Sequence, residues 1–222
     1  MLAPVAGSAR EYIEAAAALI EKRLNGPDGA PAAAFCRLFY AYVPTVDLAE
    51  IEPETLCRQA LSVFKLAERR EGSGPAIRVF NPTLGYDGWR SGHTVVEIVQ
   101  DDMPFLVDSV TSLLNGKGLG VHLVIHPVMR FSRVDGAIVA VEPRARARGD
   151  ESIMQIHIDE RTDAQELASL ETAISDALAA VRSSVEDWAE MRKMAAATIE
   201  DLAHRAPPNA DPAEVQEAAD FL

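Results

Sequence analysis

The first 74 residues repeat apolar side chains at the three- and four-residue spacing of amphipathic helices. This spacing predicts three helices, which NGPDG at 25–29 and Pro44 separate and GSGP at 72–75 ends. None of the three carries a motif with a chemical function. We therefore expect residues 1–74 to be a helical N-terminal region without chemistry of its own.

The pattern changes at residue 76 to the two-residue alternation that is typical of strands. One helix, with Leu106, Val110 and Leu114 on one face, interrupts the alternation and ends at the glycines of NGKGLG. The strands are expected at AIRVF, at HTVVEIVQ, and near 120–132, 137–142 and 152–158. This order predicts an α+β fold, in which helices cover one face of a mostly antiparallel sheet as an α/β sandwich.

Helical spacing returns at Asp163 and continues to about Arg205. At 1.5 Å per residue this helix would be a rod of roughly 60 Å, longer than a small sheet can cover. Its far half is expected to pack on the first bundle, on a partner chain, or on both. We therefore expect the chain to divide into residues 1–74, a sandwich at 75–185, and a continuation at 186–222 that would lead toward a missing downstream region.

Charge and composition narrow the possible partners. The formal net charge is -13 and the isoelectric point is about 4.8, which argues against nucleic acid and anionic membranes as partners. The sequence lacks a run of about 20 apolar residues, and its first residues do not resemble a signal peptide. We expect a cytoplasmic protein, in which Cys36 and Cys57 are buried thiols on apolar helical patterns.

The strand GVHLVIHPVMRF places its polar and apolar side chains on opposite faces. If its apolar face aligns with the apolar faces of the neighbouring strands, several polar groups share the uncovered side of the sheet. We expect these residues to form an interface with another domain or subunit: Glu97, His122, Val124, His126, Arg130, Gln155 and His157.

Two chemical roles are open to this region, and we consider both less favoured than a structural one. His122 and His126 are four strand residues apart, about 13 Å at roughly 3.3 Å per residue, which is too far for both to bind one metal ion. Asp101, Asp102 and Asp108 resemble paired catalytic carboxylates, but Asp102 stands where the N-cap of a helix belongs. We therefore predict neither a metal site nor a catalytic residue.

Three strings of this sequence resemble a known family. DDMPFLVDSV, GLGVHLVIHPVMR and ESIMQIHIDE are similar to the opening module of the large bacterial NAD-specific glutamate dehydrogenases, most closely over residues 93–160. In that family the module is an ACT-like, or ferredoxin-like, domain ahead of a distant catalytic region. The resemblance implies that the parent enzyme deaminates glutamate oxidatively to 2-oxoglutarate and ammonia with NAD as its cofactor.

The chain itself lacks the dinucleotide fingerprint of such an enzyme. It has no G-x-G-x-x-G after a strand, and GSGPAI precedes a strand instead of opening a helix. The resemblance thus implies a non-catalytic regulatory or assembly segment without a cofactor, whose partners are other domains or subunits of the same enzyme. The alternative is an independent ACT-type module that senses amino acids.

The resemblance also points to one candidate effector site. ACT domains that bind amino acids use the loop from the first core strand into the following helix, and its counterpart here is Asp102, Met103, Pro104 and Phe105. This loop departs from the binding pattern, because it has no glycine, Pro104 removes an N–H donor, and two acids would repel a carboxylate. An amino-acid effector remains a hypothesis for these four residues.

Overall fold

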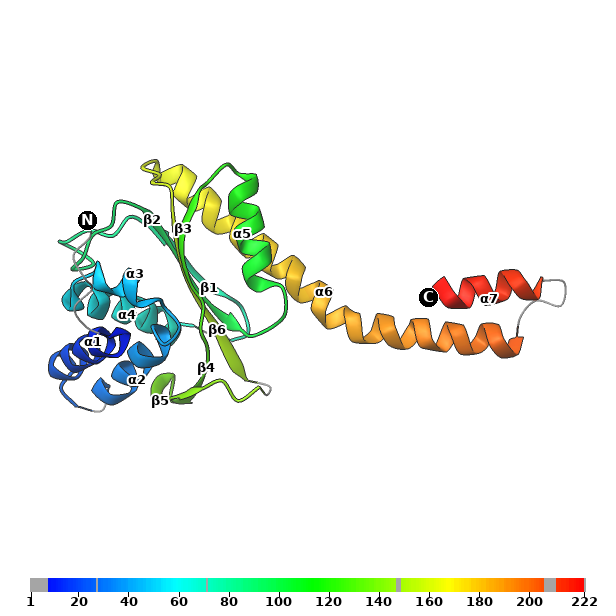
Figure 1. Cartoon of the computed structure of the whole chain (residues 1–222), viewed down its shortest axis with the longest axis horizontal. Helices are drawn as coiled ribbons and strands as arrows, with labels where there is room; N and C mark the ends of the chain where they lie inside the picture. Colours follow the sequence, from blue (N-terminus) through cyan, green and yellow to red (C-terminus); the bar gives the residue numbers. More distant parts are fainter. Residues whose placement is uncertain (1–7, 27, 71, 147–148, 206–210, 222) are drawn as a thin grey trace. The chain divides into compact units, whose positions relative to one another are not determined.

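The computed structural model describes residues 8–26, 28–70, 72–146, 149–205 and 211–221. They form two compact units, one that ends at residue 178 and one that begins at 179. The first unit contains the helical region, the sheet and the start of the long helix (Figure 1).

Four helices precede the sheet. They are α1 (Ala9–Arg23), α2 (Gly29–Phe39), α3 (Thr45–Ala49) and α4 (Pro53–Glu68). At the start of α1 the Ser8 N–H donates to the Glu11 carboxylate at 2.8 Å, and Pro53 takes the first position of α4, where its missing N–H costs nothing. Three of the helices confirm the prediction, and the five-residue α3 is additional, too short for a periodic pattern to reveal.

The sheet has six strands, and all of its strand pairs are antiparallel. The strands are β1 (Ala76–Phe80), β2 (Thr94–Asp101), β3 (Val121–Ile125), β4 (Val128–Val134), β5 (Ala137–Pro143) and β6 (Asp150–Ile158). Their order is β1-β2-β6-β4-β5, and β3 also pairs with β6. Since β2 and β3 both run antiparallel to β6, they are parallel to each other, and β6 lies between them. The helix α5 (Leu106–Gly116) connects these two parallel strands.

The predicted strand near 120–132 is in fact two strands. The break falls at His126 and Pro127, and Pro127 has no N–H to donate to the ladder. Its carbonyl still accepts from the Ile153 N–H at 3.0 Å, so β3 and β4 remain on the same side of β6. Strand β2 pairs with the other edge of β6, and β1 pairs with β2 and ends the sheet on that side.

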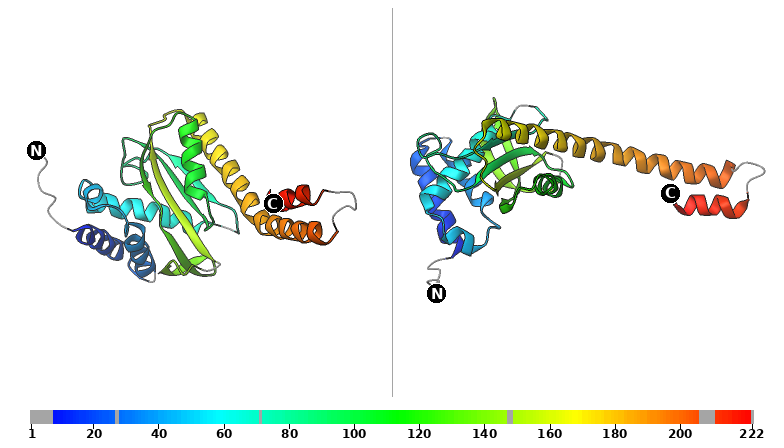
Figure 2. Two further views of the ribbon diagram at one scale, coloured as in Figure 1. Left: turned by 45° about the vertical axis from the view of Figure 1, so that its right-hand side comes forward. Right: turned by 90° about the horizontal axis from the view of Figure 1, so that it is seen from above.

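Helices cover both faces of the sheet, which corrects the expectation of a sheet with one open face. Helices α1–α4 lie on one face, while α5 and the first turns of α6 (Ala164–Arg205) lie on the other (Figures 1 and 2). We call α1–α4 the helical layer. This layer and the sheet share a core, in which the ring of Phe35 on α2 stacks on that of Phe131 on β4 with 6.1 Å between centroids. Cys36 and Cys57 are buried free thiols within this core.

The second unit contains the part of α6 from residue 179 and the short helix α7 (Pro212–Phe221). Several of its large apolar side chains are exposed, among them Trp188, Met191 and Met194 on α6. A search of the described residues finds no helix that is both long and apolar enough to cross a membrane.

Candidate functional site

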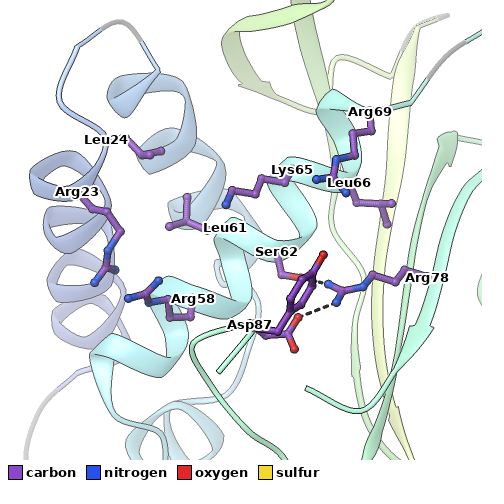
Figure 3. Close-up of a pocket in the computed structure, with 11 residues that line it drawn as sticks. Arg23, Leu24, Arg58, Leu61, Ser62, Lys65, Leu66, Arg69, Arg78 and Asp87 are labelled. Carbon is purple, nitrogen blue, oxygen red and sulfur yellow. Dashed lines mark hydrogen bonds and ion pairs between the residues drawn. The ribbon is translucent and has the colours of Figure 1, made fainter. Parts of the chain in front are cut away.

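A pocket of about 250 Å³ lies between the helical layer and the sheet (Figure 3). Its walls come from α1, α4, β1 and the connection between β1 and β2. The lining includes five cations: Arg23, Arg58, Lys65, Arg69 and Arg78. Such a concentration of positive charge is notable in a chain whose net charge is -13.

Helix α4 supplies most of this charge because its sequence separates into two stripes. Arg58, Ser62, Lys65 and Arg69 recur at intervals of four, three and four residues, which places them on one helical face. Residues on the opposite stripe, such as Val63, are buried in the core. This basic stripe is readable in the sequence from the spacing of its residues, but we predicted this helix from its apolar positions alone.

The five cations differ in how their charge is compensated. Arg23 and Arg58 share the Glu54 carboxylate at 2.7 and 3.0 Å, and Arg78 binds Asp87 at 2.6 Å. Within the part of the chain that the structure describes, no ion-pair partner lies within 4.0 Å of Lys65 or Arg69. The positive charges of these two side chains act at longer range on the Glu68 carboxyl, where they lower a pKa that burial raises. Both side chains are exposed and available to an anion.

A chain of hydrogen bonds leads from the pocket into the centre of the sheet. The other end of the Arg78 guanidinium donates to the Ser62 hydroxyl at 3.2 Å. That hydroxyl donates to the Glu97 carboxyl at 3.0 Å, and the Gln155 amide donates to its second oxygen at 3.2 Å. The site thus consists of a pocket lined by cations and a buried carboxyl, that of Glu97, beneath it.

Burial of the Glu97 side chain raises its pKa to about 7. The hydrogen bonds from Ser62 and Gln155 and the charge of Arg78 favour the ionised form, but desolvation outweighs them. Because Glu97 is fully buried, its carboxyl cannot reach a molecule in the pocket. It therefore acts on the site only through Ser62 and Arg78.

One glycine is required where the loop meets α4. Gly88 has a φ of +77°, and a Cβ atom there would lie 3.1 Å from the Arg58 guanidinium. The neighbouring Asp87 closes the loop, since its carboxylate accepts from the Thr83 N–H at 2.9 Å. The absence of a side chain at Gly88 leaves room for the Arg58 guanidinium, and the Asp87 hydrogen bond orders the loop that forms this wall of the pocket.

The predicted effector loop lies elsewhere, beyond the end of β2. Helix α5 begins at Leu106, and the residue before it, Phe105, is exposed with a φ of 69°. Asp102 is not the N-cap that we expected, because its N–H continues the sheet by donating to the Asp150 carbonyl at 2.9 Å. Its carboxylate binds Arg144 at 2.8 Å.

The structure does not join this loop to the basic pocket. Neither Met103 nor Pro104 lines the pocket, and the same is true of Asp102 and Phe105. Phe105 adopts the left-handed backbone conformation, and the Asp102 carboxylate is already paired with Arg144. Effector binding by Asp102, Met103, Pro104 and Phe105 stays a prediction.

The predicted sheet-face residues do not share one face. Glu97 and Gln155 are buried under the helical layer, and His157 is buried against the ring of Trp89. The register explains the difference, since Ile125 pairs with Gln155 and Leu123 pairs with His157. Apolar β3 residues therefore stand beside polar β6 residues on the same side, contrary to the alignment that we assumed.

The other predicted interface residues are more accessible. Val124 pairs with Ile156 on the opposite side of the sheet and is exposed. The His126 ring lies 2.7 Å from the Ser152 hydroxyl, and Arg130 binds Asp150 at 3.1 Å. Contacts of these residues with another subunit stay a prediction.

Three histidines gather where β3 and β6 meet. The His122 ring lies 4.3 Å from that of His93, and His157 lies 6.0 Å from His93. Burial lowers the pKa of His157 to about 4, assisted by the two neighbouring rings, while His122 binds Asp159 at 2.8 Å. Among the described residues, no group of three or more His, Cys, Asp or Glu side chains could hold a metal ion.

Comparison with known proteins identifies the family. The model described as "Glutamate dehydrogenase, ACT1 domain" matches residues 35–174, which include α4, the sheet and four of the five pocket cations. An NAD-specific glutamate dehydrogenase of Halomonas elongata is 35% identical over 207 residues, which are 91% of this chain and 13% of that protein.

A second NAD-specific glutamate dehydrogenase, from Pseudomonas aeruginosa, is 34% identical over 165 residues, or 72% of this chain and 10% of that protein. The chain thus spans a small fraction of the length of these relatives. Because the ACT1 model matches more than half of it, the chain belongs to the family of glutamate dehydrogenase ACT1 domains.

Proposed function

We propose that this chain is a non-catalytic regulatory and assembly segment of an NAD-dependent glutamate dehydrogenase. The parent reaction would convert L-glutamate, NAD⁺ and water to 2-oxoglutarate, ammonia and NADH, as the names of the relatives suggest. The observation that carries the proposal is the position of the basic pocket between two layers of the fold. A ligand held there would contact both layers and change how firmly they associate.

The described residues support binding over catalysis in this segment. The carboxyl with the most suitable pKa for proton transfer, Glu97, is sealed from the pocket. The sheet is antiparallel throughout, whereas dinucleotide-binding folds use a mostly parallel sheet with a glycine-rich turn. NAD binding and the chemistry are therefore assigned to other parts of the parent protein.

The second unit supports a role in assembly. Trp188, Met191 and Met194 expose between 60% and 64% of their surface on one helix. Exposed aromatic and methionine side chains are enriched at protein interfaces. We assign their partners to other domains or subunits of the same enzyme.

Two measurements test the proposed function. The purified 222-residue chain should form no NADH from glutamate and NAD⁺, as followed by absorbance, while the full-length parent does. In the full-length parent, saturation with NAD⁺ and glutamate should change hydrogen exchange in residues 53–70 and 76–87, because coupling between sites is reciprocal. NADH formation by the chain alone, or unchanged exchange in both segments, would contradict the proposal.

A further inference from the structure

We propose that the basic pocket binds a small dianion, either a dicarboxylate or a phosphomonoester, with Lys65 and Arg69 as its principal contacts. This inference rests on the proposed regulatory function and names the ligand class of its site. The ligand would lie between α4 and β1 (Figure 3).

The charge of the pocket determines the charge of the ligand. Two acids, Glu54 and Asp87, compensate Arg23, Arg58 and Arg78 in part. Lys65 and Arg69 add two positive charges that none of the described acids approaches as an ion pair. A dianion compensates more of this charge than a single carboxylate does, and its charged oxygens can be contacted by both side chains at once.

The size of the pocket limits the ligand to a small molecule. Its volume of about 250 Å³ is below the roughly 300–1,000 Å³ of pockets that hold drug-sized ligands. A small dianion therefore fits this volume better than a dinucleotide such as NAD. Guanidinium groups bind carboxylate and phosphate oxygens in the same forked geometry, so both kinds of dianion meet the same chemistry.

The pocket combines a rigid wall with two uncommitted cations. Arg78 is fixed by Asp87 and Ser62, and its guanidinium lies 3.5 Å from the centroid of the Phe80 ring. Arg58 is fixed by Glu54 and packs against Gly88. Because Arg78 and Arg58 are already ordered, the protein loses less side-chain conformational entropy on binding at this wall than it would on a mobile surface.

The position of the two free cations suggests how binding would be transmitted. Lys65 and Arg69 belong to α4, whereas Arg78 belongs to β1 at the edge of the sheet. A dianion that contacts all three links the helical layer to the sheet. Ligand binding would therefore stabilise the contact between the layers.

Calorimetric titration of the 222-residue chain tests the proposal. Succinate and inorganic phosphate represent the two sources of a dianion, and acetate at matched ionic strength represents a single carboxylate. We expect saturable binding of at least one dianion, and the tighter of the two identifies the ligand class. Acetate should bind about tenfold more weakly or not at all, because it can satisfy only one of the free cations.

Matched variants show whether the binding belongs to this pocket. Lys65→Gln combined with Arg69→Gln should weaken dianion binding about tenfold or more. Arg10→Gln combined with Lys193→Gln removes the same charge from exposed positions outside the pocket and should retain the affinity. Hydrogen exchange of each variant without ligand checks that it is folded.

Two results would overturn the inference: no saturable binding of either dianion, or an equal loss of affinity in both double variants. Neither result by itself overturns the proposed function, which is tested by NADH formation and by coupling in the parent enzyme. A chain that binds no dianion could still be a non-catalytic segment whose exchange responds to NAD⁺ and glutamate. The two proposals therefore fail separately.

Discussion

At the scale of single residues, burial decides the behaviour of the polar groups inside the sheet. Glu97 and His157 are both polar positions on central strands, and we expected both on an uncovered face. Both are buried, and desolvation favours the neutral form of each, so it raises the pKa of Glu97 to about 7 and lowers that of His157 to about 4. Sequence alternation shows which residues of one strand share a face, but it cannot show which residues of the neighbouring strand lie beside them or what covers that face.

Glu97 should make the stability of the protein depend on pH. Its pKa is raised in the folded state, so the folded protein binds more protons than the unfolded one between about pH 4.5 and 7. Its contribution to the free energy of unfolding is therefore full below this window and is lost as the pH rises through it. At about 1.4 kcal/mol per pKa unit, the loss is on the order of 3 kcal/mol.

The variant Glu97→Gln isolates this effect because it keeps the shape of the side chain and removes its titration. Urea unfolding between pH 5 and 8 should show similar stability of the two proteins at pH 5 and a more stable variant at pH 8. His157 titrates with the opposite sign in both proteins, so it cancels in the difference. Parallel pH profiles would show that Glu97 does not carry the effect.

At the scale of elements, the end of α4 is held to two strands by one buried arginine. The Arg70 guanidinium binds Asp101 on β2 at 2.7 Å and Glu151 on β6 at 2.8 Å, with 5% of its side chain exposed. It also donates to the Ser73 and Gly74 carbonyls, and Arg133 on β4 binds Glu151 from the other side. This network positions α4, and with it the basic stripe, over the sheet.

Loss of Arg70 should destabilise the protein strongly. Arg70→Ala leaves the buried Glu151 carboxylate with Arg133 as its remaining ion-pair partner among the described residues. The expected loss is about 3 kcal/mol in the free energy of unfolding, because the cost of a buried charge is then only partly offset. Urea unfolding at pH 7 measures it.

Arg144→Ala is the matched control, since Arg144 binds Asp102 through a side chain that is 51% exposed. Exposed ion pairs contribute about 0–1 kcal/mol. Equal losses in the two variants would show that burial of the Arg70 network adds nothing to stability.

The sequence predicts most elements but not their pairing. The periodicity of α4 and α5 and the alternation of β2 and β6 identify these elements, because each follows from local geometry. The break between β3 and β4 cannot be seen in the hydrophobic pattern, since the alternation of polar and apolar residues continues across it. The register between β3 and β6 cannot be predicted either, because the paired residues are 30 or more positions apart in the sequence.

At the scale of the whole first unit, the closure of both sheet faces could have been inferred from two strands. VVEIV on β2 and IMQIHI on β6 are nearly continuous apolar runs, which indicate strands that are buried on both sides. The family could be predicted from its characteristic strings. The basic pocket could not, because it forms only where α1 and α4 meet β1 and a loop.

Because the helical layer and the sheet share one core, we predict that the first unit unfolds cooperatively. Phe35 on α2 is fully buried and contacts Phe64 on α4 and Phe131 on β4. Phe35→Ala should lower the free energy of unfolding by about 3–5 kcal/mol. Because helices and sheet belong to one core cluster, both layers should lose this stability together.

Two probes distinguish one cooperative unit from two. In a Trp188→Phe background, the fluorescence of the buried Trp89 reports on the sheet, while far-ultraviolet circular dichroism is dominated by the helices. The two urea transitions should coincide in the parent background and shift equally in Phe35→Ala. A shift that is confined to circular dichroism would mean that the helical region folds separately, and the pocket between the two layers would then be open in that intermediate.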